Sequence, residues 1–235
     1  MDGFKMIASN IKDVRKNIET ACEKAGRDPK EVTLICVSKT KPESDIIEAY
    51  NVGERDFGEN KVQEMCEKAE DLNDDIRWHM IGHLQRNKVK YLTDSAYLIH
   101  SVDSKRLLEQ IEKEYEKAGK TARVLLEINV ALEDSKFGYT CESVIEDLPF
   151  IETLNHVKVV GLMTVAPYTD NSEENRKYFK KLKELSVDIE SKKYNNISME
   201  ELSMGMTGDY MIAIEEGATI VRVGTGIFGN RNYNV

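Results

Sequence analysis

The sequence has no run of about 18 apolar residues, which argues against a membrane-spanning helix. Residues 1–10 contain no apolar core, so we expect no secretory leader. The four cysteines (Cys22, Cys36, Cys66 and Cys141) are scattered without a C-x-x-C pair, a distribution typical of reduced thiols in a cytoplasmic protein. Lys and Arg number 33 against 42 Asp and Glu, and the net charge of −9 disfavours binding to nucleic acid or to an anionic membrane.

Several catalytic motifs are also missing or incomplete. There is no G-x-S-x-G serine motif and no P-loop. Gly224–Gly229 reads G-x-G-x-x-G, but only six residues follow it, too few for the βαβ unit of a dinucleotide site. His79 and His83 are four residues apart, yet their neighbours favour a strand over a zinc-binding helix. His100 and His156 have no companion at ligand spacing, so we expect no metal site.

The apolar segments that are present are short, and they alternate with amphipathic ones. Strands are predicted at residues 32–38, 53–57, 76–81, 97–101, 122–130, 157–163, 200–204 and 219–223. Helices are predicted at residues 43–51, 60–71, 86–92, 104–118, 141–154, 172–190 and 208–216, after an amphipathic helix over residues 2–25. This alternation predicts an α/β fold, a single (β/α)8 TIM barrel with an extra N-terminal helix that forms one domain over residues 1–235. A doubly wound parallel sheet is the alternative.

The first predicted strand runs into a lysine. Val32–Val37 is apolar enough to be buried on both faces, and Pro42 fits the first turn of the next helix. Lys39 therefore lies at the carboxyl end of a buried strand, where parallel α/β folds bind ligands. Burial disfavours a charged amine, and a neutral amine can form a Schiff base with an aldehyde. A solvated lysine at a strand end is the alternative.

The last two strand ends are rich in glycine and hydroxyl groups. Ser203–Gly208 and Gly224–Gly226 fall where barrels often bind phosphate, although ordinary tight turns have the same composition. Thr207 is a candidate N-cap, which places Asp209 in the first turn of the helix. Strand alternation points Arg222 into the barrel mouth, where it needs either a carboxylate or a ligand atom as acceptor.

Six motifs stand in order along the chain: Val37–Pro42, Phe57–Asn60, His79–Gln85, Gly161–Met163, Leu202–Met206 and Val221–Gly229. Together they resemble the pyridoxal phosphate homeostasis proteins, also called the YggS or PROSC family, over nearly the whole chain. The resemblance implies a barrel like the amino-terminal domain of alanine racemases, without their second domain.

The resemblance also implies a cofactor site. Lys39 would carry pyridoxal 5'-phosphate (PLP) as a Schiff base, and Arg222 would face the pyridine nitrogen. The phosphate would lie among Ser203, Thr207, Gly224 and Thr225, and Asn60, His83 and Met163 would line the ring. The sequence departs from the family at Lys61, where an aromatic residue is usual, at Thr207, where serine is usual, and at Gly229–Tyr233. Lys136 matches the family, but we assign it no chemistry.

An arginine on the ring nitrogen cannot act as the acid that makes PLP a strong electron sink. Alanine racemases share such an arginine but add a tyrosine from their second domain, for which a chain ending at Val235 leaves no room. We therefore expect a cytoplasmic, monomeric protein of vitamin B6 homeostasis with little or no turnover, which binds PLP and has PLP-dependent apoenzymes as candidate recipients. A small PLP-dependent amino-acid racemase is the first alternative, and a phosphate-sugar barrel enzyme without PLP is the second.

Overall fold

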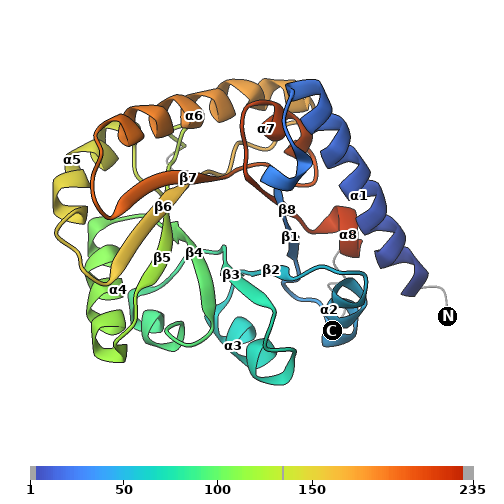
Figure 1. Ribbon diagram of the computed structural model, residues 1–235, viewed down its shortest axis with the longest axis horizontal. Coiled ribbons are helices and arrows are strands. Elements are labelled where there is room, and N and C mark those ends of the chain that lie inside the picture. Colours follow the sequence, from blue (N-terminus) through green and yellow to red (C-terminus); the bar gives the residue numbers. More distant parts are fainter. Residues whose placement is uncertain (1–3, 134, 230–235) are drawn as a thin grey trace.

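The computed structural model describes residues 4–133 and 135–229. Eight parallel strands form a closed barrel in the order β1 to β8, and helices surround it (Figure 1). The strands are β1 Thr33–Val37, β2 Asp56–Glu59, β3 Arg77–Met80, β4 Ala96–Val102, β5 Ala122–Glu127, β6 Val157–Met163, β7 Ile197–Ser203 and β8 Ile220–Val223. The predicted (β/α)8 barrel is thus confirmed, and the doubly wound sheet is wrong.

The helices follow the strands around the outside of the barrel. They are α1 Phe4–Ala25, α2 Glu43–Asn51, α3 Val62–Asp71, α4 Lys105–Ala118, α5 Cys141–Ile151, α6 Arg176–Ser191, α7 Tyr210–Glu215 and α8 Thr225–Phe228. Three 3-10 helices, η1 Pro29–Glu31, η2 Arg86–Tyr91 and η3 Ser172–Asn175, complete the described elements. The first two residues of the predicted helix 2–25, and residues 230–233 of the family's final motif, lie outside the described residues.

Strand β1 shows how the sequence separates the two layers of the core. Leu34 and Cys36 pack outward against the helices, whereas Ile35 and Val37 point into the barrel, as the period of two requires. The inner cluster consists of Ile35, Val37, Leu98, Leu125, Val160, Met163 and Ile220. This apolar plug fills the barrel and forms the floor beneath its carboxyl-terminal mouth.

Several boundaries differ from the sequence prediction. The strand expected at 53–57 begins later, because Gly53 has a φ of 108° in the turn that ends α2. The strand expected at 122–130 ends at Glu127, and the side chain of Asn129 then holds a turn by accepting a bond from the Glu133 amide. The segment at 86–92 is a 3-10 helix, which short connections often adopt.

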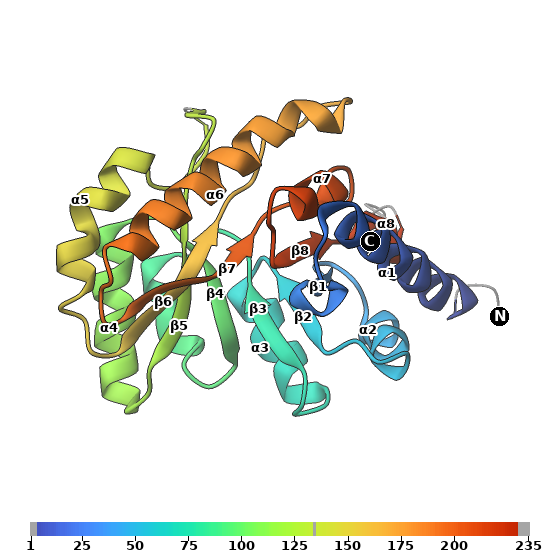
Figure 2. The same cartoon turned by 45° about the horizontal axis from the view of Figure 1, so that its top comes forward.

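Helix α1 joins the beginning of the chain to its end. Asn10 Nδ2 donates to the Ile227 carbonyl at 2.8 Å, and Asn17 Nδ2 donates to the Tyr210 hydroxyl at 3.0 Å. Figures 1 and 2 show α1 lying against α7 and α8 in both views. The helix therefore covers the seam at which β1 pairs with β8.

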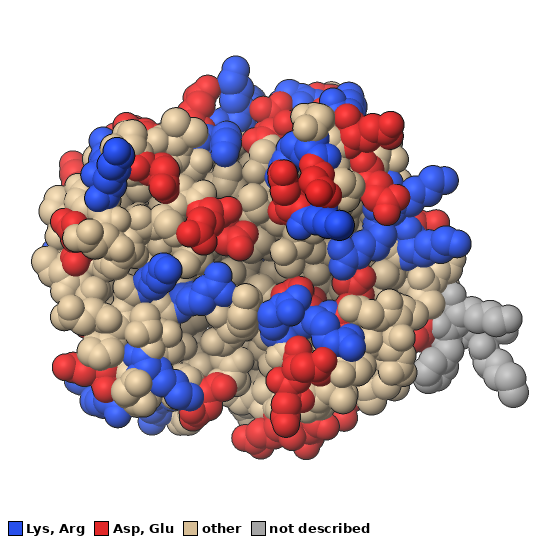
Figure 3. Space-filling view, viewed as in Figure 1, with Lys and Arg blue, Asp and Glu red and all other residues tan. Residues whose placement is uncertain are grey.

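The surface carries charges of both signs. On the face shown in Figure 3, Lys and Arg side chains are interspersed with Asp and Glu among the residues drawn in colour. None of the described helices is both long enough and apolar enough to cross a membrane.

Candidate cofactor site at the barrel mouth

A cavity of about 700 Å³ opens at the carboxyl ends of the strands. Its lining includes six of the residues singled out from the sequence: Lys39, Asn60, Thr207, Arg222, Gly224 and Thr225. Val37 belongs to the inner apolar cluster and Ile81 packs against it, and both line the same cavity. The chain thus brings together an amine, a guanidinium and two hydroxyls above an apolar floor.

Lys39 lies in a tight turn directly after β1. The Lys41 amide donates to the Ser38 carbonyl at 3.0 Å, which closes the turn, and Lys39 is half-buried. Thr40 has a φ of 62°, a left-handed conformation that a β-branched residue rarely adopts. Its amide donates to Glu64 Oε1 at 2.6 Å, which helps to hold this conformation. Pro42 is the N-cap residue of α2, one position earlier than predicted.

A buried ionic network supports the turn from the outside of the barrel. The Lys68 ammonium donates to the Ser38 carbonyl at 2.9 Å, to Glu59 Oε1 at 2.8 Å and to Glu64 Oε1 at 2.7 Å. The Ser38 hydroxyl donates to the same Glu59 oxygen at 2.6 Å. Burial raises the pKa of Glu59, and the adjacent Lys68 ammonium opposes that rise. Because this network binds both Ser38 and the Thr40 amide, it fixes the backbone on either side of Lys39.

The two glycine-rich turns meet at their hydroxyl groups. Thr225 Oγ1 donates to Thr207 Oγ1 at 3.2 Å, and the Gly226 amide donates to the same Thr207 oxygen at 3.3 Å. The prediction of Thr207 as an N-cap is wrong, since Asp209 is the N-cap residue of α7. Asp209 accepts a bond from the Met206 amide at 2.7 Å and so shapes the turn that presents Thr207. Hydroxyls and an amide gathered in this way suit a phosphate group.

Arg222 points into the barrel, as its strand alternation predicts. It is 4% exposed, and its Nη2 donates to the Thr164 carbonyl at 2.8 Å. Its Nη1 donates to Ser203 Oγ at 2.5 Å. Burial lowers the pKa of Arg222 to about 10, against the attraction of Glu127 and Asp209. The side chain thus remains a charged donor at neutral pH.

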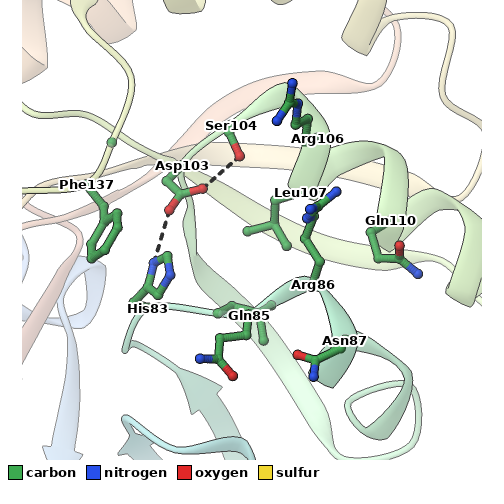
Figure 4. Close-up of a pocket in the computed structure, with 12 residues that line it drawn as sticks. His83, Gln85, Arg86, Asn87, Asp103, Ser104, Arg106, Leu107, Gln110 and Phe137 are labelled. Atoms are coloured by element: carbon green, nitrogen blue, oxygen red, sulfur yellow. Dashed lines mark hydrogen bonds and ion pairs between the residues drawn. The ribbon is translucent and has the colours of Figure 1, made fainter.

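Three of the predicted ring and phosphate residues lie elsewhere around the cavity. Met163 is part of the inner apolar cluster beneath the mouth, and Ser203 is fully buried beside Arg222. His83 lines a neighbouring cavity of about 830 Å³, shown in Figure 4. There its ring stacks on Phe137 with centroids 3.8 Å apart, and its Nδ1 lies 3.1 Å from Asp103. The roles predicted for these three residues toward a cofactor stay predictions.

Close backbone packing sets the position of Asn60. A Cβ added to Gly82 would lie 2.4 Å from the Asn60 carbonyl oxygen, so only glycine lets the loop after β3 approach this closely. The loop thereby supports Asn60 at the edge of the Lys39 cavity.

Sequence reasoning missed the groups that support the site. Glu59 belongs to one of the six motifs but was given no role, and Lys68 was not singled out. The bonds from Lys68 to Glu59 and Ser38 join residues that are 9 and 30 positions apart along the chain. His79 was set aside as a strand residue and His100 as isolated, but His79 Nδ1 lies 2.9 Å from His100 Nε2 on the adjacent strand. Parallel pairing of their strands was the one available signal. Among the described residues, no group of three or more His, Cys, Asp or Glu is arranged to hold a metal ion.

The barrel, the lysine after its first strand and the phosphate-suited turns define a class of protein, the one built on the barrel of alanine racemases. Residues 9–232 match the family described as "Alanine racemase, N-terminal domain". The chain belongs to this family and, within it, to the pyridoxal phosphate homeostasis proteins. It is 47% identical over 221 residues to the protein of that name from Aquifex aeolicus, covering 94% of this chain and 96% of the relative. It is 35% identical to that of Escherichia coli K12, covering 97% and 98%.

Solved structures agree with this assignment. PipY of Synechococcus elongatus, described as "with PLP bound", is 33% identical with a TM-score of 0.82, covering 95% of this chain and all of PipY. A protein described as unknown, from Bifidobacterium adolescentis, reaches a TM-score of 0.92 at 36% identity, covering 97% of both chains. Alanine racemase of Clostridium difficile, with a TM-score of 0.75 at 13% identity, shares the fold, and this chain spans 58% of its length.

Proposed function

We propose that this protein binds PLP as a Schiff base on Lys39 and takes part in intracellular PLP homeostasis, with little or no catalytic turnover. The observation that carries the proposal is the cavity whose lining brings together Lys39, Arg222 and the hydroxyl-bearing Thr207 and Thr225. An amine for the aldehyde, a donor for the ring and hydroxyls for the phosphate are the groups that PLP requires. The names of the relatives and the PLP-bound PipY structure support the same cofactor.

Each residue has a distinct part in this proposal. The Lys39 amine would join the aldehyde carbon as a Schiff base with loss of water, while Thr207, Gly224 and Thr225 would bind the phosphate. Arg222 would donate toward the ring nitrogen, and Asn60 would border the ring. Once bound, PLP supplies an electrophilic aldehyde and a conjugated ring.

The proton chemistry of Arg222 and Tyr168 supports low turnover. Arginine keeps its own protons, so Arg222 cannot supply a proton to the ring nitrogen. The tyrosine in the described lining, Tyr168, is 93% exposed and donates to Asp170 at 3.2 Å, so it is not held over the cavity as an acid or base. A racemase needs such a group on the face opposite Lys39.

Reductive trapping tests the proposal directly. Purified protein incubated with PLP should turn yellow, and borohydride should then fix one PLP on the peptide that contains Lys39. The Lys39→Ala variant should bind no covalent PLP, whereas Lys61→Ala, which removes an exposed lysine outside the cavity lining, should be labelled like the wild type. Protein that stays colourless, or labelling at another lysine, would contradict the proposal.

Turnover is tested with the same preparation. Incubation with alanine, serine and other amino acids should leave their chirality unchanged on the timescale of ordinary enzymes. Racemisation at about 1 per second or faster would favour the racemase instead.

The proposed setting is the cytoplasm, with the protein as a monomer and PLP-dependent apoenzymes as recipients of the cofactor. Light scattering should return the chain mass of 26.8 kDa. PLP-loaded protein can be mixed directly with an apoenzyme or separated from it by a dialysis membrane. The apoenzyme's activity should return faster when the two proteins are mixed directly.

A further inference from the structure

A chain of hydrogen bonds crosses the barrel interior to the cavity. His79 Nε2 lies 3.0 Å from Asp56 Oδ1, and His79 Nδ1 lies 2.9 Å from His100 Nε2. His100 Nδ1 lies 2.9 Å from Ser203 Oγ, which accepts the 2.5 Å bond from Arg222. The chain therefore joins β2, β3 and β4 to β7 and β8 on the other side of the barrel.

Burial makes the direction of these bonds important. None of the five residues is more than 7% exposed. An unmade hydrogen bond at a buried polar group is costly, so donors and acceptors along the chain must match.

The Arg222 end fixes one direction. A guanidinium donates only, so Ser203 Oγ accepts from Arg222 and its own proton needs an acceptor. Among the described residues, the remaining hydrogen-bond partner of that hydroxyl is His100 Nδ1. His100 then accepts at Nδ1 and carries its proton on Nε2, which donates to His79.

The Asp56 end independently fixes the same direction. Burial opposes ionisation of Asp56, but hydrogen bonds from Arg77 and His79 outweigh it and lower its pKa to about 2. An ionised carboxylate only accepts, so His79 carries its proton on Nε2 and accepts at Nδ1. Burial also lowers the pKa of both histidines, which keeps the rings neutral as this arrangement requires.

We propose that Asp56, His79 and His100 are positioning residues, which fix the Ser203 hydroxyl through a chain of one-directional hydrogen bonds and thereby hold Arg222 in the Lys39 cavity. With Ser203 and the Thr164 carbonyl bound, Arg222 keeps a single orientation and presents its remaining N–H groups to a ligand. The expected benefit for PLP binding rests on the proposed function. The tautomers assigned to His79 and His100 do not depend on it.

Nitrogen-15 NMR of the histidine rings tests the chain. The protein has four histidines, and His83→Gln and His156→Gln assign the other two signals. At pH 7, His79 and His100 should both be neutral with the proton on Nε2. A proton on Nδ1, or a charged ring, at either residue would overturn the proposal, and this measurement on the wild-type protein needs no destabilising variant.

A remote substitution tests the coupling to the cavity. In the wild type, Asp56 Oδ1 accepts from both His79 and Arg77, and Oδ2 accepts from Arg77. Asp56→Asn removes the negative charge that these donors share, and it opposes an NH2 group to a donor of Arg77 in either amide orientation. Asp56→Asn should therefore perturb the signals of His79 and His100 and weaken PLP binding about fivefold. The control is Asp75→Asn, which removes a carboxylate that pairs with Arg55 and Tyr50 and takes no part in this series of hydrogen bonds. It should change neither the histidine signals nor the affinity for PLP.

The outcomes separate the two proposals. If Asp56→Asn leaves the His100 signals unchanged, or if it perturbs them without weakening PLP binding, the positioning role is wrong. If the wild-type protein shows the expected tautomers but binds no PLP, the proposed function fails while the hydrogen-bond chain stands.

Discussion

Thr40 holds a backbone conformation that its branched side chain disfavours, next to the lysine proposed to bind PLP. Such strain costs about 1–3 kcal/mol and persists only where the surroundings enforce it. Thr40→Gly relieves this strain, but glycine also adds conformational entropy to the unfolded chain, which offsets part of the gain. The net effect should be a rise of about 1 kcal/mol in the free energy of unfolding. It should also weaken PLP binding, because the Lys39 turn gains conformational freedom.

Urea unfolding and PLP titration measure the two effects separately. Lys193→Gly is the matched control, since Lys193 also has a left-handed φ, 55°, but lies after α6 and outside the cavity lining. It should stabilise the protein without changing PLP affinity. Unchanged PLP affinity in Thr40→Gly would show that the strained turn does not help to hold Lys39.

Glu127, the last residue of β5, should make the stability of the protein depend on pH. Burial raises its pKa to about 7, the Asp103 carboxylate adds to the rise and Arg222 opposes it. Between about pH 4.5 and pH 7, Glu127 keeps its proton in the folded protein but loses it in the unfolded chain. The free energy of unfolding therefore falls as pH rises through this range. Glu127→Gln should therefore stabilise the protein by roughly 1–3 kcal/mol more at pH 8 than at pH 5.

Urea unfolding at the two pH values measures this difference. Exposed Glu116→Gln on α4 is the control and should show the same small change at both. An equal effect of Glu127→Gln at pH 5 and pH 8 would contradict the burial argument.

The elements were predictable where one local pattern decides them. The apolar stripe of α1 gave that helix, and the short apolar run before Lys39 gave β1, because period and burial agree there. The start of β2 and the 3-10 form of η2 depend on turns and contacts from other elements, which a local pattern does not contain.

The candidate site divides in the same way. Lys39, Arg222 and the hydroxyl turns could be placed because each follows or ends a strand, and strand ends converge in a barrel. Glu59, Lys68 and the paired histidines act through partners that only the closed barrel brings together. The role that the family resemblance implies for His83 stays a prediction, and the structure places this side chain in the lining of the neighbouring cavity.

Helix α1 should contribute to the stability of the whole barrel rather than form an independent appendage. Ile18 is 2% exposed in the core shared with the barrel's outer layer, so Ile18→Ala should lower the free energy of unfolding by about 2–5 kcal/mol. Urea unfolding should show one transition with a lower midpoint and an unchanged slope. Exposed Glu19→Ala should have little effect, and a separate early transition in Ile18→Ala would show that α1 unfolds on its own.

Because the proposed PLP site draws residues from β8 and from the loops after β1, β2 and β7, cofactor binding should stabilise the entire closed barrel. A ligand at about 100 times its Kd adds about 2.7 kcal/mol, which for a chain of this size raises Tm by roughly 5–10 °C. The Lys39→Ala variant should unfold near the wild-type Tm without PLP, since Lys39 is a half-buried cavity residue rather than a core one. With PLP it should lose most of the rise, whereas Lys61→Ala should keep it. A rise in Lys39→Ala equal to that of the wild type would show that the stabilising PLP binds away from this lysine.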